Sequence, residues 1–179
     1  MRVLFLGAYG FLLAVLLSGA AQAQFDNKMY GVNIDEDSLT PWQEVEAAPP
    51  EYPHPENLVE FYVSAATSNK FFIDAKSLSV GADSVIRYVV AIKTPSGVTN
   101  VSFEGLHCDT YERRIYALGR SDKSWSQARI KAWTVIPSAS PNGYQATLFK
   151  EYFCPSGHAI LSAEEGVDAL RRGGHPSLK

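Results

Sequence analysis

The sequence predicts an α+β domain, in which an antiparallel β-sheet meander of five to seven strands carries one or two C-terminal helices and follows an extended N-terminal arm. Three features predict this class: β-type apolar runs from Leu58 onward, a tight turn at residues 94–97, and helical spacing of apolar residues near the C-terminus. Short connections between strand-like runs favour local hairpins, whereas parallel strands need long crossovers. The strands are therefore expected to pair with their neighbours in the chain.

Residues 1–23 have the layout of a secretory signal peptide. Arg2 gives a positive start, Val3–Gly19 is uncharged and mostly apolar, and Ala21–Ala23 forms a small-x-small exit. The alternative is a membrane-spanning helix, but the apolar run is slightly short for a bilayer and no basic cluster follows it. We therefore expect an exported chain with no transmembrane span. No cysteine lies near the cleavage point, so a lipid-modified N-terminus is not expected.

Charge divides the rest of the chain into two parts. Residues 24–58 carry eight acids and one base, giving −7, whereas residues 59–179 carry eleven acids and fourteen bases, giving +3. Nucleic-acid binding is not expected, because it needs a dense cationic surface. We expect residues 24–41 to be an acidic, flexible linker before a single domain at residues 42–175. The acidic stretch is either a solvated tail or a segment that lies on the basic face of the domain.

Residues 24–57 look irregular, because their five prolines restrict the backbone and remove amide donors. Trp42 and Tyr52 are exceptions in this stretch, since a fully solvated tail has little use for large aromatic side chains. One or both are expected to dock on the domain.

The strands are expected to begin with the alternation at Val59–Val63 and the short apolar run at Phe71–Ile73. Val85–Lys93 is nearly continuous and rich in β-branched residues, as in a central strand that is buried on both faces. Pro95 and Gly97 fit a tight turn, because proline presets one backbone angle and glycine permits another. The remaining expected strands are Val98–Asp109, Ile115–Leu118 and Ala132–Ile136, with a turn at residues 109–113.

The C-terminal region changes to helical spacing. Its apolar residues fall at i, i+3, i+6 and i+7, on one side of a helix, although their alternation also permits a strand. These residues are Ala146, Phe149, Tyr152 and Phe153. Ser162 and Glu165 fit a capping box that starts a second helix. Arg171 and Arg172 suit its last turn, and Gly173 is expected to end it.

Cys108 and Cys154 are the only cysteines, and export favours their pairing in a disulfide. The bridge would span 46 positions, a closure that the loop-entropy relation values at roughly 4 kcal/mol. The alternative is a metal site that adds His107 and His158. On a strand, however, His107 points away from Cys108, and oxidation removes both thiolates. We therefore expect a disulfide and no metal.

The sequence contains no recognisable catalytic motif. Gly-x-Ser-x-Gly, a phosphate-binding glycine loop, a dinucleotide fingerprint and His-Glu-x-x-His are all missing from it. Ser156 lies close to His158, but a turn after Cys154 explains this pair without catalysis. No catalytic residue and no cofactor is therefore expected.

Basic and aromatic residues concentrate between residues 113 and 133. Arginine forks bind carboxylate or phosphate, and tryptophan offers stacking area. The alternative is a plain basic surface with the tryptophans in the core. The candidate residues for binding an anionic partner are Arg113, Arg114, Arg120, Lys123, Trp125 and Arg129, and Tyr116, Lys131 and Trp133 accompany them.

Several short segments occur together along the chain. They include Trp42-Gln-Glu, Asn57-Leu-Val-Glu-Phe, Phe72-Ile-Asp-Ala-Lys-Ser-Leu, Asn100-Val-Ser-Phe-Glu-Gly-Leu-His-Cys and Tyr152-Phe-Cys. In this combination the chain resembles the CNP-like (cryptic neisserial protein-like) family of bacterial envelope proteins, from about Trp42 to about Ala169. The resemblance implies a Gram-negative, periplasmic location and a single CNP-like domain. It supplies no catalytic residues.

The leading hypothesis is a non-enzymatic periplasmic module that binds or scaffolds, with an anionic envelope component or another envelope protein as its partner. One alternative is a hydrolase or isomerase acting on a cell-wall or small-molecule substrate, and another is a surface protein attached to the outer membrane. A cleft that holds His107 or His158 beside a carboxylate would favour the enzyme. A flat or convex basic and aromatic face would favour binding.

Overall fold

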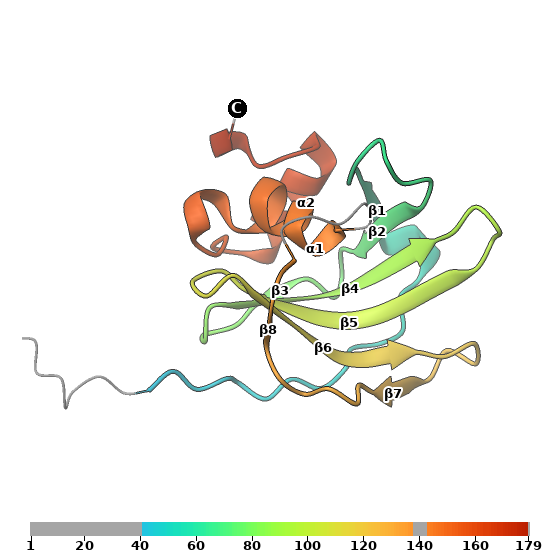
Figure 1. The fold of residues 1–179 in the computed structure, drawn as a ribbon, viewed down its shortest axis with the longest axis horizontal. Coiled ribbons are helices and arrows are strands. Elements are labelled where there is room, and N and C mark those ends of the chain that lie inside the picture. Colours follow the sequence, from blue (N-terminus) through green and yellow to red (C-terminus); the bar gives the residue numbers. More distant parts are fainter. Residues whose placement is uncertain (1–40, 138–142, 179) are drawn as a thin grey trace, which may run out of the picture. The chain divides into compact units, whose positions relative to one another are not determined.

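The computed structural model describes residues 41–137 and 143–178, so the expected signal peptide and nearly all of the expected linker lie outside the described residues. The described chain has the predicted α+β class, with helices packed on one face of an antiparallel sheet (Figure 1). These ranges contain eight strands, one more than the largest number predicted, and two of them have only two residues. The strands are β1 (Leu58–Phe61), β2 (Lys70–Asp74), β3 (Ser79–Val80), β4 (Val85–Lys93), β5 (Thr99–His107), β6 (Glu112–Gly119), β7 (Trp125–Gln127) and β8 (Thr134–Val135).

The sheet is a meander in which each pair of neighbouring strands is antiparallel. Its order is β1-β2-β4-β5-β6-β7, while β3 pairs with β4 and β8 pairs with β6. Strands β4 and β5 pair along their full length, starting with Val85 opposite His107. The turn between them is the predicted one, since Gly97 has a φ of +87° and its amide donates to the Thr94 carbonyl at 2.9 Å. The predicted central hairpin is thus confirmed.

Both faces of β4 are buried, as predicted for a central strand. Tyr88 points into the core beneath the helices and packs against Phe153, with ring centroids 5.7 Å apart. Val89 points to the other face and joins a smaller cluster with Phe103, which residues of the chain's N-terminal part also enter. We define residues 42–57 as the N-terminal arm. The sheet therefore lies between the helices on one face and this arm on the other.

Some strands differ from their expected bounds. β6 already starts at Glu112, inside the expected turn, and the strand expected at Ala132–Ile136 is reduced to Thr134–Val135. β3 and β7 were not predicted at all. Two or three residues are too few to show an alternation, so these short strands form because a longer neighbour supplies their hydrogen-bond partners.

The first C-terminal element is helical, as favoured over a strand. α1 (Tyr144–Thr147) runs directly into the π-helix η4 (Leu148–Phe153). The π-helix ends where the Cys154 amide donates to the Phe149 carbonyl, five residues back, at 3.0 Å. Three-residue 3₁₀ segments lie at η3 (Pro55–Asn57), η5 (Pro155–Gly157) and η6 (Pro176–Leu178).

The second helix, α2 (Ala163–Arg172), starts at the predicted capping box. Ser162 Oγ accepts a hydrogen bond from the Glu165 amide at 3.3 Å. The Glu165 carboxylate reaches back and accepts one from the Leu161 amide at 2.6 Å. Gly173 ends the helix with a φ of +69°, which glycine adopts without strain. The predicted start and end of α2 are therefore confirmed.

Candidate functional site

Strand β6 distributes the predicted contact residues over the two faces of the sheet. Arg113 lies opposite Leu106, which is in the core beneath the helices, so Arg113 is on the helix side. Arg114 lies opposite Gly105 and is on the other side, where it meets the N-terminal arm. The six candidate residues therefore do not share one surface.

Three of the candidate arginines line one open groove beside β6. Arg113, Arg120 and Arg129 share this groove of about 700 Å³, whose volume is in the usual range for ligand pockets. Lys123 lies in the exposed turn that follows Arg120. We term this site the arginine groove. Its other lining residues are Ile115, Leu118, Ser126, Gln127, Ala128, Ile130, Ala132 and Thr134.

The groove forms because the chain that returns along β6 is longer than the part of the strand that it faces. Pairing with β6 stops at Gln127 on β7 and resumes at Thr134 on β8. Between these points, residues 114–116 of β6 face residues 128–133, three residues more than a regular ladder needs. The extra residues must leave the sheet edge, and we term residues 128–133 the bulge segment.

The groove arginines have no carboxylate partner within the part of the chain that the structure describes. There, none of Arg113, Arg120 and Arg129 forms an ion pair, and the Nε of Arg113 is buried without a hydrogen-bond partner. Asp122 is close enough to Arg120 to feel its charge. Its carboxylate, however, accepts hydrogen bonds from the Ser124 hydroxyl and amide at 2.6 and 3.0 Å, which lower the pKa of Asp122. The three arginines of the groove lining thus form no ion pair within the described residues, although Arg120 lies near Asp122.

On the opposite face of the sheet, Glu44 of the N-terminal arm is the centre of a polar cluster. Its carboxylate accepts hydrogen bonds from the Tyr116 hydroxyl at 2.7 Å and the Trp133 indole at 3.0 Å. Arg114 forms an ion pair with the same carboxylate. Burial, and next the bond to Glu44, raise the pKa of Tyr116, so this hydroxyl stays protonated and donates. Arg114 therefore neutralises an acid of its own chain.

A buried ion pair next to this cluster also holds the arm. Arg87 donates to the Asp83 carboxylate at 3.0 and 2.6 Å and to the Val45 carbonyl at 2.8 Å. The Val45 amide donates to Asp83 at 2.7 Å, so both members of the pair bind the arm backbone. Burial alone would raise the pKa of Asp83, but Arg87 and the amides of Val45 and Val85 outweigh it and lower the pKa to about 2.

Aromatic side chains anchor the arm near both of its ends, as expected for Trp42 and Tyr52. The Trp42 ring stacks on His107 with 4.6 Å between ring centroids. Tyr52 packs against Trp125 with 5.4 Å between centroids, and the Trp125 indole donates to the Pro50 carbonyl at 2.9 Å. Trp125, one of the candidate contact residues, therefore binds the arm and does not line the arginine groove.

A buried carboxylate on the helix side was not predicted. Glu104 is 1 % exposed and lies among hydrogen-bond donors from β4, β5 and α1. The donors are the Ser102 and Tyr144 hydroxyls at 2.5 and 2.6 Å, the Gln145 amide at 3.3 Å and the Tyr88 hydroxyl at 3.4 Å. Burial, and next the Glu104 charge, raise the pKa of both tyrosines well above the usual value. This network joins the sheet to the first C-terminal helix.

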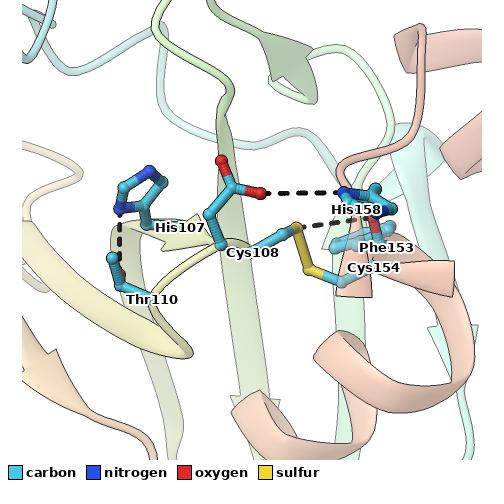
Figure 2. Close-up of a disulfide and its surroundings, with 7 residues drawn as sticks. His107, Cys108, Thr110, Phe153, Cys154 and His158 are labelled. Carbon is cyan, nitrogen blue, oxygen red and sulfur yellow. Dashed lines mark hydrogen bonds and ion pairs between the residues drawn. A yellow bond between two sulfur atoms is a disulfide. The ribbon is translucent and has the colours of Figure 1, made fainter. Parts of the chain in front are cut away.

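The predicted disulfide links Cys108, just after β5, to Cys154 at the end of η4. Figure 2 shows the His107 ring directed away from this bridge, while His158 lies on the same side as the bridge. The bridge thus uses both thiolates of the alternative metal site, and His107 lies apart from His158. Among the described residues, no three histidine, cysteine or acidic side chains are grouped as metal ligands.

The two histidines considered for an enzyme have different surroundings. His107 is buried between Trp42 and Trp133, and its Nδ1 lies 2.9 Å from the Thr110 hydroxyl. His158 lies 3.8 Å from the Asp109 carboxylate, but both side chains are exposed (Figure 2). Neither arrangement is the enclosed pair of histidine and carboxylate that would favour catalysis.

Within residues 41–137 and 143–178, no helix has the length and apolar character needed to cross a membrane. No curated protein and no solved structure matches the chain. The sequence profile of the CNP1-like family, in contrast, matches residues 37–171. This range contains the N-terminal arm, the sheet, the arginine groove and the disulfide. The match covers most of the chain and agrees with the segments noted in the sequence. The chain is a member of the CNP1-like family.

Proposed function

We propose that this protein is an exported, non-enzymatic binding module of the bacterial cell envelope, and that the arginine groove is its contact surface for an anionic partner. The observation that carries the proposal is the set of three groove arginines, Arg113, Arg120 and Arg129, none of which forms an ion pair with a carboxylate of the described chain. A guanidinium binds carboxylate or phosphate strongly, because its planar fork supplies two parallel hydrogen bonds.

The basic and aromatic residues between positions 113 and 133 thus form two groups with different roles. Arg114 and Trp125 hold the N-terminal arm, together with Tyr116 and Trp133. The groove arginines remain for an external anion, and Lys123 adds charge from the adjacent turn. Export is proposed from residues 1–23. The Cys108–Cys154 disulfide supports it, because such bridges persist in oxidising compartments.

A photo-crosslinking residue placed in the groove tests the proposal in intact cells. Gln127 is exposed and lines the groove, whereas Ser96 is exposed in the turn between β4 and β5 and serves as the matched control position. The Gln127 probe is expected to capture an envelope component that the Ser96 probe does not capture. The adduct should disappear when all three groove arginines are changed to glutamine. Equal capture at both positions, or capture that does not depend on the arginines, would refute the proposal.

A further inference from the structure

We infer that the arginine groove docks on an anionic phospholipid surface, with Ile130 entering the interface between the lipid headgroups. The inference rests on the proposed function and names the anion as the phosphate of a membrane lipid. It follows from three properties of the groove: exposed aliphatic side chains, arginines in the same lining as Ile130, and a backbone segment that departs from the strand ladder.

The groove exposes apolar surface beside its arginines. Ile130 is 69 % exposed and Leu118 is 46 % exposed, and both line the groove. Single exposed aliphatic side chains are normal on a protein surface, but apolar side chains gathered with polar ones in a concave site mark a contact surface. A free phosphate would satisfy the guanidiniums and leave Ile130 in water, and an acidic peptide would need an apolar side chain beside its acids to cover Ile130. A lipid surface provides both an anionic headgroup and an apolar layer beneath it.

The residue that precedes Ile130 fits the same partner. Arg129 lines the groove, is exposed and forms no ion pair in the described part of the protein. Lys131, which follows Ile130, is also exposed but lines the smaller pocket with Glu44 and Glu46. Long cationic side chains can reach phosphates at the headgroup level while an apolar neighbour enters the interface. Arg113 and Arg120 add charge that attracts the groove to an anionic leaflet.

The backbone of the bulge segment carries Ile130 away from the strand ladder. The bulge segment, residues 128–133, has three residues more than the facing part of β6, so it leaves the ladder after Ala128, whose amide still donates to the Tyr116 carbonyl at 3.0 Å. It carries Ile130 at the sheet edge formed by β7 and β8. On the opposite face of β6, the N-terminal arm binds Arg114 and leaves a smaller pocket of about 350 Å³ that its own acids Glu44 and Glu46 line. The arginine groove is larger, about 700 Å³, and no residue of the arm lines it.

Cosedimentation of the purified chain with lipid vesicles tests the inference. We expect binding to vesicles of phosphatidylglycerol and phosphatidylethanolamine, no binding to phosphatidylcholine vesicles, and weaker binding as salt is raised from about 0.05 to 0.3 M. Ile130→Asp should reduce the partition coefficient about tenfold or more. The matched control is Leu161→Asp, because Leu161 is 90 % exposed and lies outside the groove. It should bind like the unchanged chain.

A second pair of variants separates charge from apolar contact. Arg129→Gln should weaken binding and reduce its salt dependence, whereas Arg171→Gln, on an exposed position of α2, should change neither. The side chains of Ile130 and Leu161 are exposed, so circular dichroism should show the same fold in all variants.

The inference fails if anionic vesicles are not bound, or if Ile130→Asp binds like Leu161→Asp. It also fails if soluble glycerol phosphate at millimolar concentration displaces the protein completely and the Ile130 change has no effect, because the groove then binds a free anion. These results leave the proposed function intact if the Gln127 probe still captures a partner through the arginines. Loss of that capture as well would refute both.

Discussion

Replacing both Cys108 and Cys154 with alanine is expected to lower the melting temperature by about 10–15 °C. The bridge spans 46 positions, and the loop-entropy relation gives about 13 cal/mol/K for its closure, or about 4 kcal/mol at 25 °C. At about 2.1 cal/mol/K per residue, the segment from Trp42 to Leu178 unfolds with an entropy of about 0.29 kcal/mol/K. Dividing the two values gives a decrease of about 14 °C.

Thermal unfolding followed by far-ultraviolet circular dichroism measures this decrease. Alanine is the appropriate replacement, because both sites are buried and a serine hydroxyl there would need a hydrogen-bond partner. The unchanged chain treated with reductant should have the same melting temperature as the variant. Mass spectrometry should show the intact bridge in the untreated chain. A variant that melts within about 3 °C of the oxidised chain would refute the reasoning, because the bridge would then not restrict the unfolded state.

Four other predictions concern the arm and the buried polar groups. Asp83, with its pKa lowered to about 2 from 3.8, stabilises the fold fully above pH 3.8 and loses roughly 2 kcal/mol as the pH falls toward 2. The free energy of unfolding, measured with urea, should therefore fall less steeply with decreasing pH in Asp83→Asn than in the unchanged chain. Equal pH slopes of this free energy in the two proteins would contradict the prediction. Burial raises the pKa of Tyr144 in the folded chain, so the folded state favours the protonated hydroxyl. The contribution of Tyr144 to the free energy of unfolding is therefore complete below pH 10 and decreases above it. Tyr144→Phe should make the alkaline loss of stability shallower, and an unchanged alkaline limb would contradict the role of burial. Glu104→Gln should lower the free energy of unfolding in urea by about 1–3 kcal/mol, because the hydrogens of the new glutamine amide would face the surrounding donors. An unchanged free energy of unfolding would mean that the network is energetically neutral. Trp42→Ala should keep the circular dichroism spectrum but speed cleavage of the arm in limited proteolysis, and cleavage at the original rate would show that other contacts hold the arm.

The parts of the fold with a strong local pattern could be predicted from the sequence. β4 is buried on both faces, so its side chains are apolar almost without interruption. The start of α2 depends on Ser162 and Glu165, three positions apart, and its end depends on Gly173. β7 is different, because its strand conformation depends on pairing with β6 and not on its own residues, so its existence could not be inferred from periodicity. A strand was expected at Ala132–Ile136, but pairing with β6 limits it to the two residues of β8.

The candidate site was visible in the sequence as a concentration of charge, but its division was not. Alternation along β6 places Arg113 and Arg114 on opposite faces, and this much a strand pattern implies. That Arg114 binds Glu44, which is 70 positions away, depends on where the N-terminal arm crosses the sheet. Glu104 did have a signal: it lies two residues from the apolar Leu106, so strand alternation predicts the same face for both. A lone acid on an apolar face needs donors, and the sequence does not reveal that α1 supplies them.

The attachment of the N-terminal arm has a consequence for the order of assembly. Glu44 is synthesised early, but its partners Arg114 and Trp133 follow 70 and 89 positions later. Contacts between such distant positions form slowly, because a long loop must close first. Until Trp125 has emerged, Val89 and Phe103 have no complete cover on that side, and they are a natural target for a chaperone during biogenesis. The N-terminal arm is synthesised before the sheet, but it is thus among the last parts of the described chain to find its place.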